Sequence, residues 1–188
     1  MKDTLFDVPG HMDRSAEISE CGLYRWWLRR SWTNWENGQA VPGKGVCCFV
    51  MLNPSTADGT QDDPTIRRCI GFAKRWGYNT LSVRNLFPYR ATDPAELVKA
   101  ERTVDVFGGG RGGRGELELL AACTADLLVT AWGAGVPFGR DKFALELFAR
   151  HFPKVSLYCL GTTKKGHPRH PLYVKAEQPL LRLMGGGE

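Results

Sequence analysis

The sequence lacks the features of a membrane-spanning or secreted protein. No stretch of about 18 apolar residues runs uninterrupted through its 188 residues, so no transmembrane helix is expected. The first seven residues, MKDTLFD, also lack the apolar core of a signal peptide. We therefore expect a cytoplasmic protein that has no membrane partner.

Metal-binding and disulfide patterns are also missing. The six cysteines form no C-x-x-C pair, and no histidine stands beside them at the spacing of a zinc site. Free buried thiols are expected instead, because cysteine in an apolar run behaves as a small hydrophobic residue. The histidines are spread too widely to suggest a metal triad. We expect no metal and no other cofactor.

The sequence contains no phosphate-binding loop of the form G-x-x-x-x-G-K-[ST]. Residues 108–115 (GGGRGGRG) have the glycines of such a loop. However, no predicted strand precedes them, and no lysine takes the required place. This segment is therefore interpreted as a local glycine-rich loop.

Composition and charge are those of a basic globular protein. Hydrophobic residues make up 43% of the chain and charged residues 24%, which is enough apolar material for a buried core. The net charge of +5 favours a polyanionic partner, either nucleic acid or a nucleotide. Residues 1–20 are polar and aperiodic and are predicted to form a flexible arm. Residues 21–188 are predicted to form a single domain.

Apolar runs alternate with amphipathic segments along the chain. Residues 46–52 are continuously apolar, which is typical of a strand buried on both faces, and they are the best candidate for a central strand. A helix is predicted from Asp62 and Asp63 to Gly77, because acidic residues and proline occupy its first turn. Residues 80–87 form the next predicted strand. Further helices are expected at 93–100, 116–125 and 141–152, and further strands at 126–132 and 155–160.

This alternation predicts an α/β fold with three layers, α/β/α, around a mainly parallel sheet of four or five strands. Residues 23–32 are predicted to add an antiparallel strand near the N-terminus. That segment interleaves three arginines with three tryptophans. It is either a surface on which nucleic-acid bases stack or an edge strand with one buried face.

In a parallel sheet, ligands gather where the strands end, so the loops after the strands are the candidate site. All four are rich in glycine, proline, amide, hydroxyl or basic groups. These loops are 53–56 (NPST), 85–90 (NLFPYR), 132–135 (WGAG) and 161–173 (GTTKKGHPRHPLY).

Several of these motifs resemble an uncharacterised bacterial and phage family known as domain of unknown function 1643. The resemblance covers most of the chain from about Tyr24 to Tyr173 and implies no assigned activity. One departure from the family pattern is the glycine-rich segment 108–115, which stands where an acidic segment with proline and asparagine is expected. The motifs that carry the resemblance are 51–58 (MLNPSTAD), 62–69 (DDPTIRRC), 84–94 (RNLFPYRATDP) and 170–173 (HPLY).

The chain more remotely resembles the uracil-DNA glycosylase superfamily, particularly its mismatch-specific branch. In that superfamily the first core strand ends in a Gly-x-Asn-Pro type motif, and a His-Pro motif follows the last strand. Asn53-Pro54 matches the first motif, and either His170-Pro171 or His167-Pro168 matches the second. Met51 replaces the usual glycine, which puts the base that fits the pocket in question.

This resemblance implies a glycosylase-like fold and hydrolysis of an N-glycosidic bond in nucleic acid or a nucleotide. Asn53 would orient the attacking water with support from Ser55, and His170, or alternatively His167, would donate to the departing base. The other substrate-binding candidates lie in the same loops. They are Asn85, Phe87 and Tyr89, with the aromatic pair stacking on the base, and Lys164, Lys165 and Arg169, which would hold phosphates.

Structural interpretations of the same residues remain open. Asn53 and His170 each precede a proline and are also typical of turns. The run from Lys164 to Arg169 is alternatively a solvated loop, and Phe87 and Tyr89 are alternatively part of the core edge.

Two other functions are compatible with the sequence. One is a non-catalytic nucleic-acid-binding module that uses only the basic loops. The other is a metal-dependent nucleotide-processing enzyme that uses Asp58, Asp62 and Asp63. For Asp62 and Asp63, capping of the following helix is the competing explanation.

Overall fold

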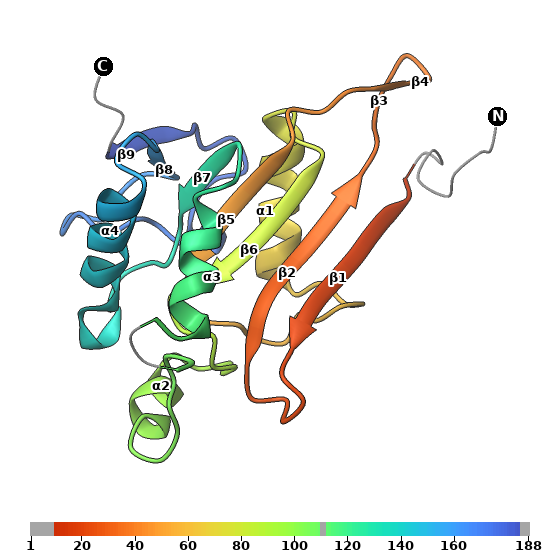
Figure 1. The fold of residues 1–188 in the computed structure, drawn as a ribbon. Coiled ribbons are helices and arrows are strands. Elements are labelled where there is room, and N and C mark those ends of the chain that lie inside the picture. The colour runs from red at the N-terminus through yellow and green to blue at the C-terminus, as the bar shows by residue number, and fades with distance from the viewer. Residues whose placement is uncertain (1–9, 110–111, 185–188) are drawn as a thin grey trace.

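The computed structural model describes residues 10–109 and 112–184, which form a mixed α/β fold (Figure 1). Its main sheet has seven strands in the order β1-β2-β6-β5-β7-β8-β9. The strands are β1 (Met12–Ile18), β2 (Arg25–Trp32), β6 (Thr80–Asn85), β5 (Val46–Met51), β7 (Leu127–Thr130), β8 (Leu157–Cys159) and β9 (Leu181–Met184). A small hairpin, β3 (Asn34–Glu36) with β4 (Gln39–Val41), extends from the end of β2.

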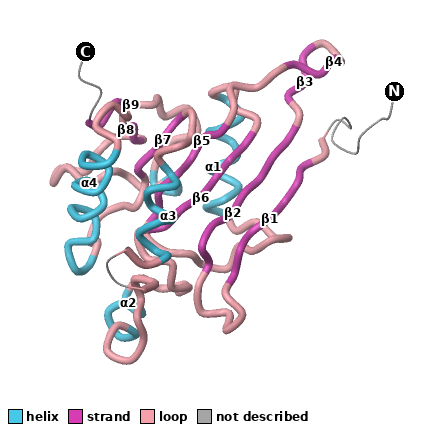
Figure 2. Tube along the Cα trace, in the orientation of Figure 1, coloured by secondary structure: helices cyan, strands magenta, loops and turns pink. Residues whose placement is uncertain are grey.

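Four α-helices accompany the described strands (Figure 2). They are α1 (Pro64–Arg75), α2 (Ala95–Ala100), α3 (Arg114–Ala122) and α4 (Arg140–His151). Short 3-10 turns at Pro137–Gly139 and Pro171–Tyr173 lie in the connections. No helix in the described ranges has both the length and the apolar character needed to cross a membrane.

Strand β5 is the central strand, as its apolar sequence predicted. It pairs in parallel with β6 on one side and with β7 on the other, and β7 pairs in parallel with β8. Alternate side chains of β5 enter two different cores. Phe49 packs in a cluster with Ile66 and Phe72 of α1, whereas Val50 packs in a cluster with Leu119 of α3. Helices therefore cover both faces of the sheet.

The sheet is larger and more mixed than the sequence predicted. The predicted antiparallel strand at residues 23–32 is present as β2, but the sheet also contains antiparallel β1 beyond it at one edge and antiparallel β9 at the other. Strand β1 lies within the segment predicted as a flexible arm, of which residues 1–9 are outside the described part. These edge strands carry no continuous apolar run, and their backbone pairing leaves no mark in the hydropathy pattern.

The start of helix α1 confirms one capping prediction and corrects another. Asp63 is the N-cap residue, and its Oδ1 accepts a hydrogen bond from Ile66 N at 2.8 Å. Asp62 does not cap the helix. Its carboxylate instead pairs with Arg30 of β2, with 2.6 Å between Oδ1 and Nε.

Other predicted features are placed as follows. Five of the six cysteines are buried and all six are free thiols, but Cys21 is exposed. Part of the glycine-rich segment forms the start of α3, while residues 110 and 111 lie outside the described residues.

Arg30 is the most completely buried charged residue of the described ranges, and it holds the loop before α1. Its guanidinium donates to the carbonyl oxygens of Asp58 and Gln61 at 2.6 and 3.1 Å, in addition to the Asp62 pair. Three groups from one loop thus converge on one side chain of β2. Because α1 follows this loop directly, Arg30 sets the position at which that helix begins.

We predict that Arg30→Ala lowers the free energy of unfolding by about 3–5 kcal/mol, because it removes the donor of Asp62 Oδ1 and of two loop carbonyl oxygens and leaves the mostly buried carboxylate only the longer contact with Arg14. Urea denaturation measures the change. The matched control is Arg29→Ala, which removes an exposed arginine from the next position of the same strand and is expected to change stability by no more than about 0.5 kcal/mol. Equal losses in the two variants would contradict the role of the Arg30 cluster.

Candidate functional site

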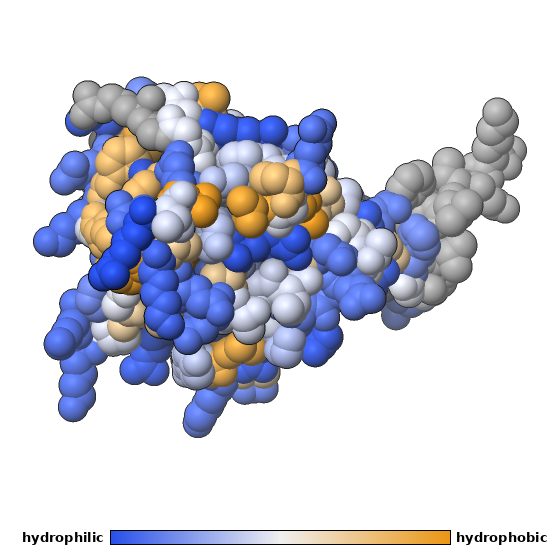
Figure 3. Space-filling model, turned by 90° about the horizontal axis from the view of Figure 1, so that it is seen from below, coloured by the Kyte–Doolittle hydropathy of each residue, from blue (hydrophilic) through white to orange (hydrophobic). Residues whose placement is uncertain are grey.

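A cavity of about 880 Å³ lies where the parallel strands end. Its walls come from the segments that follow β5, β6 and β7, from the first turn of α1 and from the loop between β8 and β9. Figure 3 views the molecule from the side toward which β6 points in Figure 1, and apolar residues are interspersed with hydrophilic ones on this face. The sequence predicted a site at this edge of the sheet.

Asn53, immediately beyond β5, lines the cavity with its side-chain amide fixed in orientation. Its Nδ2 donates to the carbonyl oxygens of Ala91 at 2.7 Å and Pro54 at 3.1 Å. These two acceptors identify which end of the amide is nitrogen. The NH₂ group therefore has a structural role in the turn, and the Oδ1 acceptor is left without a protein partner among the described residues.

His170 lines the same cavity from the opposite loop. Its Nδ1 accepts a hydrogen bond from Leu172 N at 3.3 Å, so the neutral ring carries its proton on Nε2. Burial lowers the pKa of His170 below 6.5, while the negative charge of Asp63 acts in the opposite direction. At neutral pH the ring is therefore an uncharged N–H donor.

Contacts from α1 and from the exit of β7 hold the His170 loop in place. Arg68 of α1 donates to the carbonyl oxygens of Pro171 and Val174. Gly133 N donates to Pro168 O at 3.0 Å. Gly133 has φ of +81°, a conformation that favours glycine, and an added Cβ would lie 3.6 Å from that of His170. The loop position is thus set by two elements distant in sequence.

Of the other predicted site residues in these loops, four line the cavity and two do not. Ser55, Asn85, Lys164 and Arg169 line it, whereas Lys165 and His167 do not. The His167 ring instead lies beside Asp141, with 3.6 Å between Nδ1 and Oδ2.

The two predicted stacking residues are not at the cavity either. Phe87 is fully buried in the core between Phe107 and Phe138, so its ring has no free face for a base. Tyr89 is half-buried and packs edge-on against Tyr24. Both residues follow the core-edge interpretation, because the chain after β6 turns inward at Leu86 and Phe87.

The cavity contains residues that were not chosen from the sequence. Arg25, at the start of β2, is 2% exposed and donates to Ala57 O at 2.8 Å and to Asn85 Oδ1 at 3.3 Å. Burial lowers its pKa to about 10, which leaves it charged at neutral pH. Trp132 and Tyr173 also line the cavity. The available signal for Arg25 was its place in the segment that interleaves three arginines with three tryptophans.

The three acidic residues before α1 are occupied within the protein. Asp58 accepts from Thr60 N, Thr60 Oγ1 and Gln61 N, and the two backbone hydrogen bonds are the main reason that its pKa falls to about 2. Asp62 pairs with Arg30, and Asp63 caps α1. In the part of the chain that the structure describes, no group of three His, Cys, Asp or Glu residues is placed to hold a metal ion.

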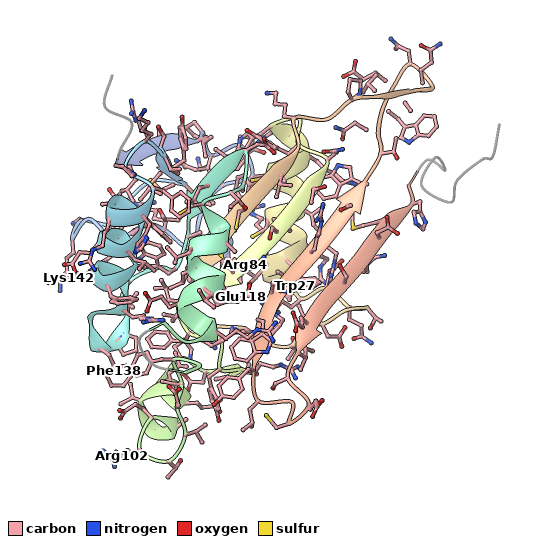
Figure 4. The ribbon with its side chains drawn as sticks, viewed as in Figure 1. Trp27, Arg84, Arg102, Glu118, Phe138 and Lys142 are labelled. Carbon is pink, nitrogen blue, oxygen red and sulfur yellow. The ribbon has the colours of Figure 1, made fainter. Side chains whose placement is uncertain are left out.

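The tryptophans of β2 contact the protein's own arginines. Trp27 packs beside Arg84, which forms an ion pair with Glu118 of α3 at 3.1 Å (Figure 4). Trp26 packs under Arg114, with 4.6 Å from the guanidinium carbon to the ring centre. The cation–π partners of these tryptophans come from within the chain. The segment is antiparallel as predicted, but it is not an edge strand, because β2 pairs with β1 on one side and with β6 on the other.

We predict that the imidazole of His170 titrates with a midpoint below 6.5 in an NMR pH titration. The unfolded chain then binds more protons than the folded one as the pH falls below about 6.5, so His170 lowers stability on the acidic side. Asp63→Asn keeps the capping oxygen but removes the charge that opposes this shift, and it should lower the midpoint further. A midpoint at or above 6.5 would contradict the buried, neutral ring.

Comparison with known proteins places the chain in a family. The family described as protein of unknown function (DUF1643) matches residues 25–172, which include Asn53 and His170. No curated protein and no solved structure matches the chain. The resemblance to the uracil-DNA glycosylase superfamily therefore stays a prediction. The match covers well over half of the sequence, and the chain belongs to the DUF1643 family.

Proposed function

We propose that the protein hydrolyses an N-glycosidic bond in nucleic acid or a nucleotide. The observation that carries this proposal is the pairing of a free Asn53 Oδ1 acceptor with the neutral His170 ring, both lining one cavity. Along the chain, Asn53 follows β5, the first of the parallel strands, and His170 follows β8, the last of them. This placement supports the proposed likeness to a glycosylase fold, in which the corresponding motifs occupy the same two strand ends.

The two groups suit the charges that develop during this reaction. As the C–N bond lengthens, positive charge builds on the sugar and negative charge on the leaving base. Asn53 Oδ1 accepts a hydrogen bond from a water and directs its lone pair toward the anomeric carbon. His170 Nε2–H donates to a carbonyl oxygen of the base. The bond's electron pair leaves with the base, and the water's proton passes to solvent.

The cavity and its rim also suit a nucleotide. Its volume falls within the ~300–1,000 Å³ usual for ligand pockets. Lys164 and Arg169 are exposed and basic, as phosphate contacts require. Tyr173 is 81% exposed, with its ring centre 5.6 Å from that of His170. In this proposal Tyr173 takes over the base-stacking role that the sequence suggested for Phe87 and Tyr89.

The alternatives differ in what they require of these residues. A non-catalytic nucleic-acid-binding module would use Lys164 and Arg169 without Asn53. A metal-dependent enzyme would need Asp58, Asp62 and Asp63 as ligands, but their carboxylates are already engaged. Of these three functions, we favour glycosidic hydrolysis because it is the one that uses both the free amide oxygen of Asn53 and the neutral imidazole of His170. We place the reaction in the cytoplasm.

We predict that the protein releases bases from nucleotides or from oligonucleotides that carry uracil, mismatched thymine, hydroxymethylated or other modified bases. Base release is read by chromatography, and oligonucleotide products are read by alkaline cleavage at abasic sites. Asn53→Ala and His170→Ala should each lower the rate by roughly 100-fold or more, which is typical of losing a positioned donor or acceptor. His151→Ala, at the exposed end of α4, is the matched control and should retain the wild-type rate.

Three outcomes would overturn this proposal. The first is no base release from any member of the panel, and the second is full activity in both folded variants. The third is loss of activity on chelation, which points to the metal-dependent alternative. Salt-sensitive nucleic-acid binding that Asn53→Ala leaves intact, without abasic product, would identify the binding module instead.

A further inference from the structure

Three residues in the lining of the cavity carry buried donors that have no acceptor. The nitrogen atoms Arg25 Nε, Asn85 Nδ2 and Trp132 Nε1 are buried and make no hydrogen bond with any described residue. All three residues line the cavity. Buried polar groups in folded proteins are almost always paired, because an unpaired donor loses its hydration without compensation. Three such donors around one cavity indicate a missing acceptor group.

Arg25 also lacks an ion-pair partner at contact distance, as comparison with Arg30 shows, although the carboxylates of Asp63 and Asp58 act favourably on its charge from farther away. Both arginines lie on β2 and both are almost fully buried. Arg30 has Asp62 at 2.6 Å, whereas no carboxylate of the described residues lies within salt-bridge distance of Arg25. Arg25 Nη2 donates a hydrogen bond to the amide oxygen of Asn85, which is a neutral acceptor. A buried guanidinium is normally paired with an anion.

Two further features favour negative charge in the cavity. The first turn of the 12-residue helix α1 borders it, and the N-terminal end of a helix carries partial positive charge. Lys164 and Arg169 add positive charge from the opposite loop. Asp63 is the one acidic residue of the lining, and its Oδ1 is engaged as the cap of α1.

We propose that Arg25, Asn85 and Trp132 form a subsite for a phosphate group of the substrate. Phosphate offers three acceptor oxygens to these three donors, and its charge pairs with the Arg25 guanidinium. The assignment of substrate class rests on the proposed function. Because the subsite is buried, it fits a free nucleotide or a terminal phosphate better than an internal nucleotide of a duplex.

The test compares phosphorylated and neutral ligands by thermal shift and calorimetry. Nucleoside 5′-monophosphates and inorganic phosphate should raise the melting temperature of the wild-type protein. The matched nucleosides and acetate, which supplies a carboxylate, should raise it much less. A nucleoside that binds as tightly as its monophosphate would overturn the subsite.

Asn85→Asp is the sharpest variant because it keeps the side-chain shape and gives Arg25 an internal counter-ion. We expect at least tenfold weaker binding of the monophosphate and a higher melting temperature without ligand. The matched control is Asn37→Asp, which makes the same change in the exposed β3–β4 turn and should bind as wild type. Unchanged monophosphate binding by Asn85→Asp would overturn the proposal.

Trp132→Phe is a second variant, independent of the charge of Arg25. It removes one unpaired donor and keeps an aromatic ring, so the folded protein should bind the monophosphate more weakly. Unchanged binding would remove Trp132 from the subsite. Phosphate-dependent stabilisation without any base release would refute the proposed function and leave the subsite standing. Base release at equal rates from nucleosides and nucleotides, without phosphate-dependent stabilisation, would refute the phosphate subsite and leave the proposed function standing.

Discussion

Parallel pairing of β5 with both β6 and β7 is the constraint on which the rest of the structure depends. Because these strands run in the same direction, the residues that follow them meet at one edge. Asn53 and Trp132, far apart in the chain, thereby line a single cavity. Burial of β5 by helices on both faces leaves this edge as the place where its polar neighbours can reach a ligand.

The two buried arginines of β2 differ in how completely the protein satisfies their hydrogen-bonding groups. Arg30 finds its acceptors in the loop before α1 and so defines where that helix starts. Arg25 has two neutral acceptors and keeps an unpaired Nε beside the cavity. A buried charge without an ion-pair partner lowers the stability of the fold. An anionic ligand that pairs with it would bind more tightly, because binding removes that penalty.

Part of the fold and site followed from local patterns. The apolar run of β5, the cap at Asp63 and the polar loops after the strands were all readable, because each is set by neighbouring residues. Edge strands β1 and β9 were missed, since their pairing depends on backbone groups of distant segments. For Phe87 the sequence left base stacking and the core edge both open, and the burial of its ring decided for the core.

By itself, the sequence determined the central strand, the alternation of strands and helices, and the candidates Asn53 and His170 at the strand ends. These follow from periodicity and motif, which are properties of short segments. Only the tertiary structure decided that Asn53 presents its oxygen, that His170 is neutral, and that Arg25, Asn85 and Trp132 share a cavity with unpaired donors. Hydrogen-bond partners and burial depend on segments that folding brings together, so neighbouring residues do not reveal them.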